Sequence, residues 1–404
     1  MSRASTARIA DKSYKVLSHT IDACTYPPIA YQTLGGHRHP PNSSSRTASQ
    51  HRPSSSSQAR ALHTRDEWTA SGQGFAVPRR HGQLDPSHRP HGRLDHCNCA
   101  HGLGTDDAGE TSEIDGLNII HVAGTKGKGS TCAFAESLLR AYGSRTGFPA
   151  RTGLYTSPHL VSYEERIRIN KAPISRELFA KYFFEVWERL LETDEGENHL
   201  PRHFQLLALV SMHAFISEGV EAAVYETHHG GEYDATNVIQ NPIVTIVTSL
   251  GMDHVRQLGP GIENIAWHKS GIFKRGANAF SSKQDEAPAQ MLRQRAAEKD
   301  VKLEFVEDES GLEGTEEGAA LKPDVQRMNC ALALAAVKTF LKRTAPGKAG
   351  AVLPDDVNKG IKDFSWPGRF QTIDDGSMTW HLEGAHNEMS ITKSAEWFNE
   401  LAQK

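Results

Sequence analysis

The sequence predicts an α/β fold with a doubly wound, mostly parallel sheet and a phosphate-binding loop. Strand-like and helical segments alternate from Leu117 onward, which is typical of a parallel sheet with helices on both faces. The runs 222–225 and 243–248 are continuously apolar or β-branched, as strands buried on both faces are. A stretch rich in glycine and lysine, 121–131, links the first strand-like run to the first helical one.

The elements follow in a regular order. Strands are expected at 118–122, 222–225, 243–248, 279–281 and 303–306, and helices at 130–142, 176–192, 203–218, 262–270, 287–298 and 325–341. The acidic, glycine-rich stretch 307–319 is expected to be an exposed loop. The stretch 366–369 interrupts the alternation and indicates a hinge or linker, after which one strand (379–382) and one helix (390–402) are expected. One strand and one helix are too little for an independent domain.

Residues 1–113 have a different composition. They are rich in Pro, His, Arg, Ser and Gly and include serine runs, so they are expected to be mostly disordered because they offer little apolar surface to bury. Basic residues near the N-terminus resemble a transit peptide, although Asp11 and Asp22 argue against one. Cys97 and Cys99 could be drawn as a metal site, but their spacing lacks the usual zinc pattern.

The overall composition excludes several classes of protein. The net charge of −4 does not indicate the excess of basic residues that is typical of nucleic-acid-binding proteins. No apolar run approaches the roughly 18 residues of a membrane span, so we expect no integral membrane segment. Five scattered cysteines suit a reducing compartment, which makes the expected location cytoplasmic, mitochondrial or both.

The loop after the first strand has the features of a phosphate site. Glycine lets the backbone approach an anion closely, the N–H groups of the loop and the following helix point at it, and lysine adds full charge. The pattern differs from the common Walker motif, because Val122 holds the position of its first glycine and Gly129 separates Lys128 from Ser130. A plain surface loop is the alternative. We expect the loop to bind ATP through Gly124, Thr125, Lys126, Gly127, Lys128, Gly129 and Ser130.

Polar residues also follow two other strands. Glu226 comes directly after 222–225, and His254 lies shortly after 243–248. If these strands are neighbours of the first, both side chains meet the phosphate loop at the carboxyl edge of the sheet. A carboxylate, an imidazole and a hydroxyl there would suit Mg²⁺, directly or through water. The alternatives are a solvent-facing loop carboxylate and a buried structural histidine.

Two further runs are unusual. Lys269 is expected near a helix C-terminus, where a lysine often only complements the helix dipole. Its apolar neighbours instead predict partial burial, which would lower its pKa and open it to modification. Gly230 and Gly231 predict a close backbone approach, whereas the adjacent His228 and His229 point apart on extended backbone and do not favour a transition metal.

Six motifs occur in order and together resemble one family. They are 121–131, 156–160 with 165–170, 230–237, 248–254, 265–274 and 366–369. The chain resembles folylpolyglutamate synthase of the Mur-ligase superfamily, in its eukaryotic, fungal form, over roughly residues 114 to 404. Composition sets apart the low-complexity region 1–113. For the rest, the resemblance implies an ATP-binding domain at 114–365 and a linker with the incomplete start of a Rossmann-like domain at 366–404.

The resemblance also implies a chemistry. ATP phosphorylates the terminal carboxylate of a tetrahydrofolate polyglutamate, and the amine of L-glutamate then displaces phosphate. Mg²⁺, with K⁺ or another monovalent cation, would assist, and the chain would act as a monomer. By motif, the catalytic residues would be Lys128, His254 and Lys269, the metal ligands Ser157, Glu226 and His254, and further nucleotide contacts Asn329, Arg369 and Glu383. Lys269 matches a lysine that is carbamoylated in bacterial relatives, and 157–160 would close over the pterin.

The chain also departs from this family. Glu383 replaces an aspartate, a Rossmann-like domain is nearly absent after Lys404, and 26–113 lack the expected helical character. We therefore hypothesise that the gene model is defective at both ends. The alternatives are a dihydrofolate synthase, an inactive nucleotide-binding remnant and, less in keeping with the motifs, an interaction protein.

Overall fold

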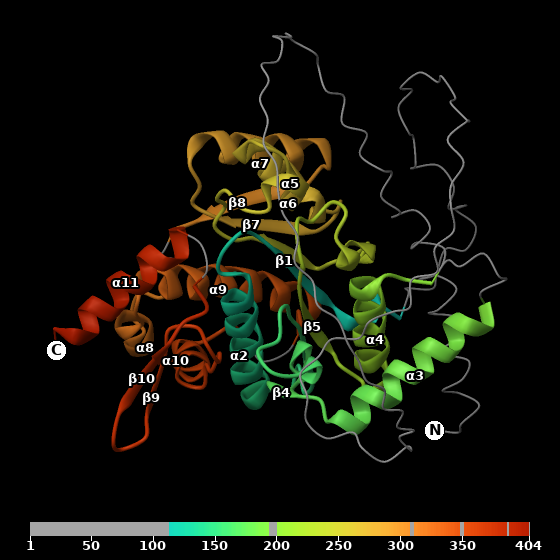
Figure 1. The fold of residues 1–404 in the computed structure, drawn as a ribbon, viewed down its shortest axis with the longest axis horizontal. Coiled ribbons are helices and arrows are strands. Elements are labelled where there is room, and N and C mark those ends of the chain that lie inside the picture. Colours follow the sequence, from blue (N-terminus) through green and yellow to red (C-terminus); the bar gives the residue numbers. More distant parts are fainter. Residues whose placement is uncertain (1–112, 194–199, 308–310, 348–350, 386–387, 404) are drawn as a thin grey trace, which may run out of the picture. The chain divides into compact units, whose positions relative to one another are not determined.

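The computed structural model describes residues 113–404, apart from 194–199, 308–310, 348–350, 386–387 and 404. The predictions made for residues 1–112, namely disorder, a transit peptide and the Cys97–Cys99 pair, lie outside the described residues. The contacts divide the chain into two units. Pro27–Leu103 forms one unit and is wholly outside the described part, so the fold below is that of the other unit (Figure 1).

The main sheet of the described residues has eight strands in the order β4-β3-β2-β5-β1-β6-β7-β8. They are β1 (Ile119–Ala123), β2 (Thr152–Tyr155), β3 (Ile167–Ile169), β4 (Ala172–Pro173), β5 (Ala222–Glu226), β6 (Val244–Val247), β7 (Asn278–Ser282) and β8 (Lys302–Val306). Pairing is parallel from β2 to β8, whereas β2–β3 and β3–β4 are antiparallel. The predicted mostly parallel α/β sheet is thus confirmed, with β1 between β5 and β6 as the site requires. The strands β2, β3 and β4 were not predicted, because they are too short for a period to show in the sequence.

The helices connect and cover these strands. They are α2 (Lys128–Thr146), α3 (Arg176–Thr193), α4 (His203–Ser217), α5 (Val255–Leu258), α6 (Ile262–Lys269), α7 (Glu286–Glu298), α8 (Glu316–Ala320), α9 (Asp324–Thr344), α10 (Pro354–Lys362) and α11 (Glu388–Ala402). In the described part of the chain, none combines the length and apolarity needed to cross a bilayer.

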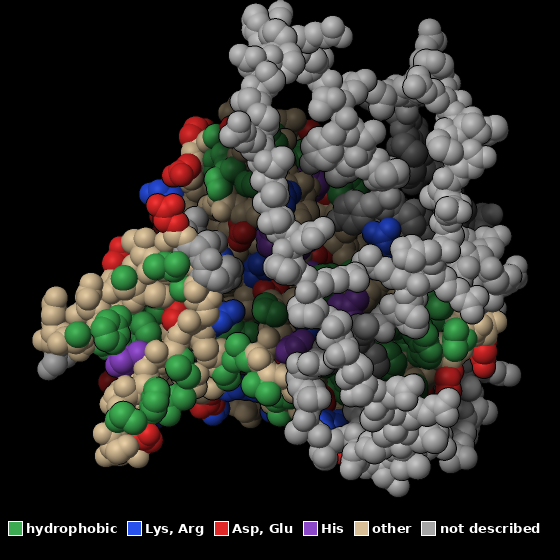
Figure 2. Space-filling model, viewed as in Figure 1, with side chains coloured by type: hydrophobic (Ala, Val, Ile, Leu, Met, Phe, Trp, Pro, Cys, Tyr) green, Lys and Arg blue, Asp and Glu red, His purple; other side chains and the backbone are tan. Residues whose placement is uncertain are grey.

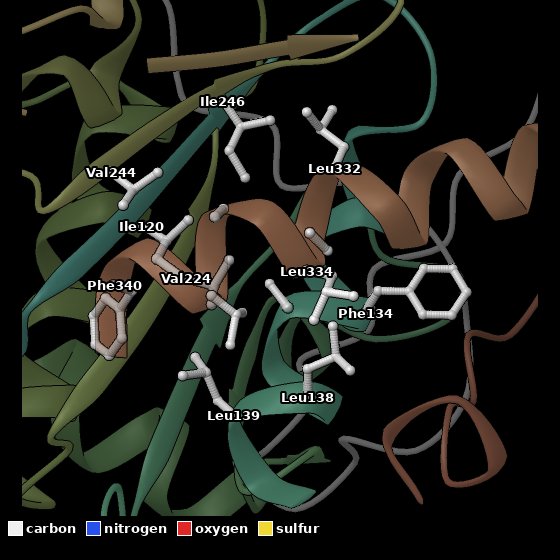
Figure 3. Close-up of a cluster of buried hydrophobic side chains, with 14 of the residues drawn as sticks. Ile120, Phe134, Leu138, Leu139, Val224, Val244, Ile246, Leu332, Leu334 and Phe340 are labelled. Atoms are coloured by element: carbon white, nitrogen blue, oxygen red, sulfur yellow. The ribbon is translucent and has the colours of Figure 1, made fainter. Parts of the chain in front are cut away.

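Alternate residues of β1 face opposite layers, as the period of a strand requires. Ile120 and Val122 join the cluster formed with α2 and α9, and Figure 3 shows Ile120 together with Leu138 of α2 and Leu334 of α9. Ile119 belongs to the cluster built with α3 and α4, and Ala123 to the one built with α6 and α7. Both faces of β1 are therefore buried, which explains why it is apolar apart from His121. The His121 side chain is itself buried, with Nε2 hydrogen-bonded to Thr236 Oγ1 at 2.8 Å.

Three local expectations were wrong. Helix α2 begins at Lys128, two residues before the predicted start, because Gly127 takes a left-handed conformation (φ 87°) and caps it. The stretch 307–319 is not simply an exposed loop, since Leu312 and Thr315 are buried and α8 begins within it. Helix α10 was not predicted. Its apolar residues are buried against α2, a contact between segments far apart in the sequence.

The segment after α10 contains the expected strand and helix and one further strand, β9 (Gln371–Asp374), that was not predicted. Trp366 packs against the cluster that contains α2 and α9. The strands β9 (Gln371–Asp374) and β10 (Thr379–Leu382) then form a separate antiparallel hairpin, followed by α11. Apolar side chains remain exposed on the hairpin and on α11, as the left of Figure 2 shows; they include Ile373, Met378, Trp380, Ile391 and Phe398.

Candidate active site

The phosphate loop leaves the carboxyl end of β1. Its N–H groups at Thr125 and Lys126 donate to the carbonyl of Ser249, at 2.9 and 3.2 Å, which ties the loop to the segment after β6. Gly124 (φ 147°) lies so close to Thr248 that a Cβ would come within 1.8 Å of its Oγ1. Only glycine fits there, so the sequence element that suggested a phosphate site is also required by packing.

Asn329 reaches the same loop from α9. A Cβ on Gly127 would lie 2.3 Å from Asn329 Oδ1, and Thr131 Oγ1 donates to this oxygen at 3.4 Å. Asn329 Nδ2 donates to Gln326 Oε1 at 3.1 Å, which fixes the amide. The residue expected to contact the nucleotide therefore lies directly against the start of α2.

Glu226 ends β5 beside the phosphate loop. It pairs in register with Val122 of β1 and is 3% exposed. Its Oε2 accepts hydrogen bonds from Thr156 Oγ1 at 2.5 Å and from the backbone N–H of Ser157 at 3.1 Å. Glu226 is thus a buried, oriented carboxylate at the strand edge, and the alternative of a solvent-facing carboxylate is wrong.

His254 lies on the other side of the loop. It takes a left-handed conformation (φ 50°) before α5, and its side chain is about half exposed. Its ring centroid is 4.7 Å from that of His229, while the neighbouring Asp253 pairs with Lys126 at 3.6 Å. The alternative of a buried structural histidine is therefore wrong as well.

Lys269, the last residue of α6, is buried with its Nζ donating to the carbonyl of Gly124 at 2.7 Å. Burial, followed by repulsion from Lys128, lowers the pKa of Lys269 well below its ordinary value. Gly231 permits this placement, because its Cα approaches the carbonyls of His268 and Lys269 too closely for a side chain. The predicted burial and the predicted close approach of the glycine pair are both confirmed.

The adjacent histidines do point apart. His228 is bonded within the protein, to Tyr155 Oη at 2.7 Å and Asp234 Oδ1 at 3.2 Å, whereas His229 faces His254.

One cavity of about 440 Å³ is lined by every predicted site residue, a size typical of small-molecule sites. From the C-terminal segment, Arg369 and Glu383 line it, with Arg369 Nη1 donating to the carbonyl of Gly368 and Glu383 Oε2 accepting from the N–H of Phe370. Residues that follow β1, β2 and β6 thus meet residues of β3, β5, α2, α6, α9 and the C-terminal segment around one cavity.

The donors fit Mg²⁺ when phosphate supplies further ligands. Among the described residues, no three His, Cys, Asp or Glu side chains are grouped as a metal centre. Mg²⁺ commonly uses one or two carboxylates together with water and substrate phosphates. Glu226 and the hydroxyl of Ser157, which line the cavity together with His254, match that use, although Ser157 Oγ already accepts from Arg166 at 3.1 Å.

Several lining residues were not singled out from the sequence. Thr156 orients Glu226. Trp366 lines the cavity beside Gly129, and Arg168 lines it next to the Trp366 ring. All three belong to motifs that carried the resemblance. The roles of Thr156 and Arg168 depend on β2 and β3, which were not predicted, and that of Trp366 depends on its packing against the cluster with α2 and α9.

The fold and the site together define a P-loop nucleotide-binding α/β domain of the type found in Mur ligases. No protein-family model matches the chain. The chain is 45% identical over 303 residues to folylpolyglutamate synthase of Neurospora crassa, covering 73% of this chain and 57% of the relative. It is 42% identical to the human mitochondrial folylpolyglutamate synthase, covering 73% and 53%. The chain is therefore related to the folylpolyglutamate synthases, as the motifs indicated, and it spans about half the length of these curated relatives.

A solved structure has a similar fold. A complex of FPGS with AMPPCP and folate superposes with a TM-score of 0.61 at 26% identity, covering 72% of this chain and 74% of that one.

Proposed function

We propose that the chain carries the ATP-binding part of a ligase that adds L-glutamate to the γ-carboxylate of tetrahydrofolate polyglutamates. The observation that carries this proposal is the meeting of the phosphate loop, Glu226 and Lys269 at the carboxyl edge of β1, β5 and β6. The relatives' names and the AMPPCP–folate complex supply the substrates. The human relative is named mitochondrial, so we propose a mitochondrial or cytoplasmic location.

Each residue has a physical task in this proposal. The loop N–H groups, Lys128 and the start of α2 hold the ATP phosphates. Lys269 fixes the carbonyl of Gly124 and so holds the entrance of the loop; its buried amine is also the site we propose for carbamoylation. Asn329 and Arg369 contact the nucleotide, with Glu383 beside them, and His254 faces the transferring phosphoryl group.

Mg²⁺ would be held by Glu226, Ser157 and His254 and would neutralise charge on the phosphates during transfer. A monovalent cation such as K⁺ is proposed on the resemblance alone.

The first test removes the charge of the phosphate loop. We expect Lys128→Ala to weaken ATP binding at least about tenfold, because a charge-assisted contact contributes on the order of 1.5–3 kcal/mol. Isothermal titration with ATP and Mg²⁺ measures this. Lys302→Ala, at an exposed lysine of β8, serves as the matched control. Equal ATP affinity in Lys128→Ala and the control would contradict the site.

The second measurement separates a ligase from a nucleotide-binding remnant. Phosphate release from ATP is followed with and without tetrahydrofolate and L-glutamate, and with dihydropteroate in place of tetrahydrofolate. Release that needs both tetrahydrofolate and glutamate supports the proposal. ATP binding without substrate-dependent release would assign the chain to the remnant class, and preference for dihydropteroate would indicate a dihydrofolate synthase.

A further inference from the structure

Arg168 is a basic residue on the cavity wall that no part of the proposed chemistry uses. It lies in β3, paired in register with Leu154 of β2. Its Nε donates to the carbonyl of Lys171 at 3.0 Å, and its guanidinium carbon lies 5.3 Å from the centre of the Trp366 ring. Within the described residues, the terminal nitrogens Nη1 and Nη2 of Arg168 make no hydrogen bond.

Nearby carboxylates do not take these nitrogens. Glu136 Oε1 accepts from Thr152 Oγ1 and from the N–H of Lys171. Glu165 accepts from three consecutive backbone N–H groups, those of Leu160, Val161 and Ser162. The guanidinium is therefore held at one nitrogen and on one face, and its other edge is left for a ligand in the cavity.

Trp366 connects this arginine to the phosphate loop. A Cβ on Gly129 would lie 3.1 Å from Trp366 Nε1 and 3.4 Å from Glu226 Oε2. The strand order places β3 three positions from β1, which is about 14 Å across a sheet. Arg168 thus lines the cavity on the β3 side, with the indole between it and the loop that would hold the ATP phosphates.

The cavity as a whole is suited to anions. Its basic side chains outnumber its carboxylates, the former being Lys126, Lys128, Arg168, Lys269, Arg369 and Lys393 and the latter Glu165, Glu226, Asp253 and Glu383. A guanidinium offers two parallel N–H donors that match the oxygens of a carboxylate or phosphoryl group.

We propose that Arg168, held against Trp366, is a second anion-binding residue of this site and receives an oxyanion on the acceptor side of the cavity. The oxyanion is either the carboxylate of the acceptor substrate or the phosphoryl group in transit to it. This inference rests on the proposed function, since it assumes that ATP occupies the phosphate loop. The phosphates of bound ATP remain the task of that loop, so Arg168 contributes little to ATP affinity.

The test uses the full chain with Arg168→Ala, Arg168→Lys and, as matched control, Arg275→Ala, whose arginine is exposed and paired with Asp300. Lysine keeps the charge but loses the planar pair of donors. Isothermal titration measures three affinities: AMPPCP with Mg²⁺, ADP with aluminium fluoride and Mg²⁺, and tetrahydrofolate with AMPPCP present. Melting temperatures identify variants that do not fold, in which case Arg168→Lys carries the test.

We expect Arg168→Ala to bind AMPPCP as the control does and to lose about 10- to 100-fold in affinity for the aluminium fluoride complex, for tetrahydrofolate or for both. Arg168→Lys should lose less. A loss confined to aluminium fluoride assigns the phosphoryl group, and one confined to tetrahydrofolate assigns the carboxylate.

Unchanged affinity for both ligands would overturn the inference, as would an equal loss for AMPPCP. If the wild-type chain failed to bind AMPPCP, the proposed function would fall, and this inference with it.

Discussion

The position of Lys269 depends on close backbone contacts at the end of α6. The loop after β5 touches the end of α6 at Gly231, where a Cβ would lie 2.5 Å from the carbonyl oxygen of His268 and 2.7 Å from that of Lys269. The N–H of Glu232 donates to the same His268 carbonyl at 2.7 Å. These contacts hold the end of α6 so that Lys269 Nζ meets the carbonyl of Gly124.

We expect Gly231→Ala to lower the free energy of unfolding by about 1–3 kcal/mol, because the neighbouring atoms are backbone and cannot rotate away. Urea unfolding measures the change. Gly116→Ala is the matched control, since nothing lies within 4 Å of its Cβ position and the residue is exposed; it should stay within about 0.5 kcal/mol of wild type. If Gly231→Ala and Gly116→Ala were equally stable, the close contact between Gly231 and the carbonyls of His268 and Lys269 would be contradicted.

Among the elements, α10 shows how a helix missed in the sequence is fixed. Arg145 of α2 donates to both carboxylate oxygens of Asp356, at 2.9 and 2.6 Å. Ser137 Oγ donates to the carbonyl of Gly360 at 2.7 Å, and Gly360 lies against Leu138. A bidentate ion pair and a close helix contact therefore dock α10 on the helix that begins at the phosphate loop.

The pair predicts a pH-dependent stability. Burial alone would raise the pKa of Asp356, but hydrogen bonds from Arg145 and the N–H of Leu353 lower it below its ordinary value of 3.8. A carboxyl group whose pKa is lowered by folding stabilises the folded state at pH values above its ordinary pKa. This stabilisation is lost as the pH falls through the pKa of the folded state. We expect Asp356→Asn to be less stable than wild type at pH 7, with a difference that shrinks as the pH drops below about 3.8.

Chemical unfolding at several pH values checks this difference. Asp355→Asn, at the exposed neighbouring position, should follow the wild-type curve throughout. A gap between Asp356→Asn and wild type that stayed constant with pH would refute the electrostatic origin.

On the scale of the whole molecule, the site joins distant parts of one unit. Lys128, Glu226, Lys269 and Arg369 come from separate segments and line the same cavity. A ligand that contacts all of them should stabilise the folded domain as a body, because it binds the native arrangement only.

We expect ATP with Mg²⁺, at about 100 times its dissociation constant, to add about 2.7 kcal/mol to the free energy of unfolding. Glu226→Gln should lose most of the Mg²⁺-dependent part, since the amide keeps the shape but not the charge of the carboxylate. Calorimetry with and without Mg²⁺ measures both effects. Glu263→Gln, at an exposed position of α6, is the control, and an identical Mg²⁺ response in the two variants would remove Glu226 from the metal site.

Much of the main sheet could be predicted because its strands and helices differ in period. The runs around Val224 and Ile246 are apolar or β-branched on both faces, which identified them as central strands. The short strands β2, β3 and β4 carry too few residues for a period to be recognised. For the same reason Thr156 and Arg168, which depend on those strands, were missed as parts of the cavity.

The sequence alone determined the glycine- and lysine-rich loop and its place between a strand and a helix, because these residues act within a few positions of one another. It also indicated the kinship with folylpolyglutamate synthases, through six motifs in a fixed order. Only the tertiary structure decided that β1 lies between β5 and β6, that Glu226 and Lys269 are buried against the loop, and that Trp366 returns to it with Arg168 alongside. These placements depend on contacts between residues far apart in the chain, and the packing of the whole sheet is what brings such residues together.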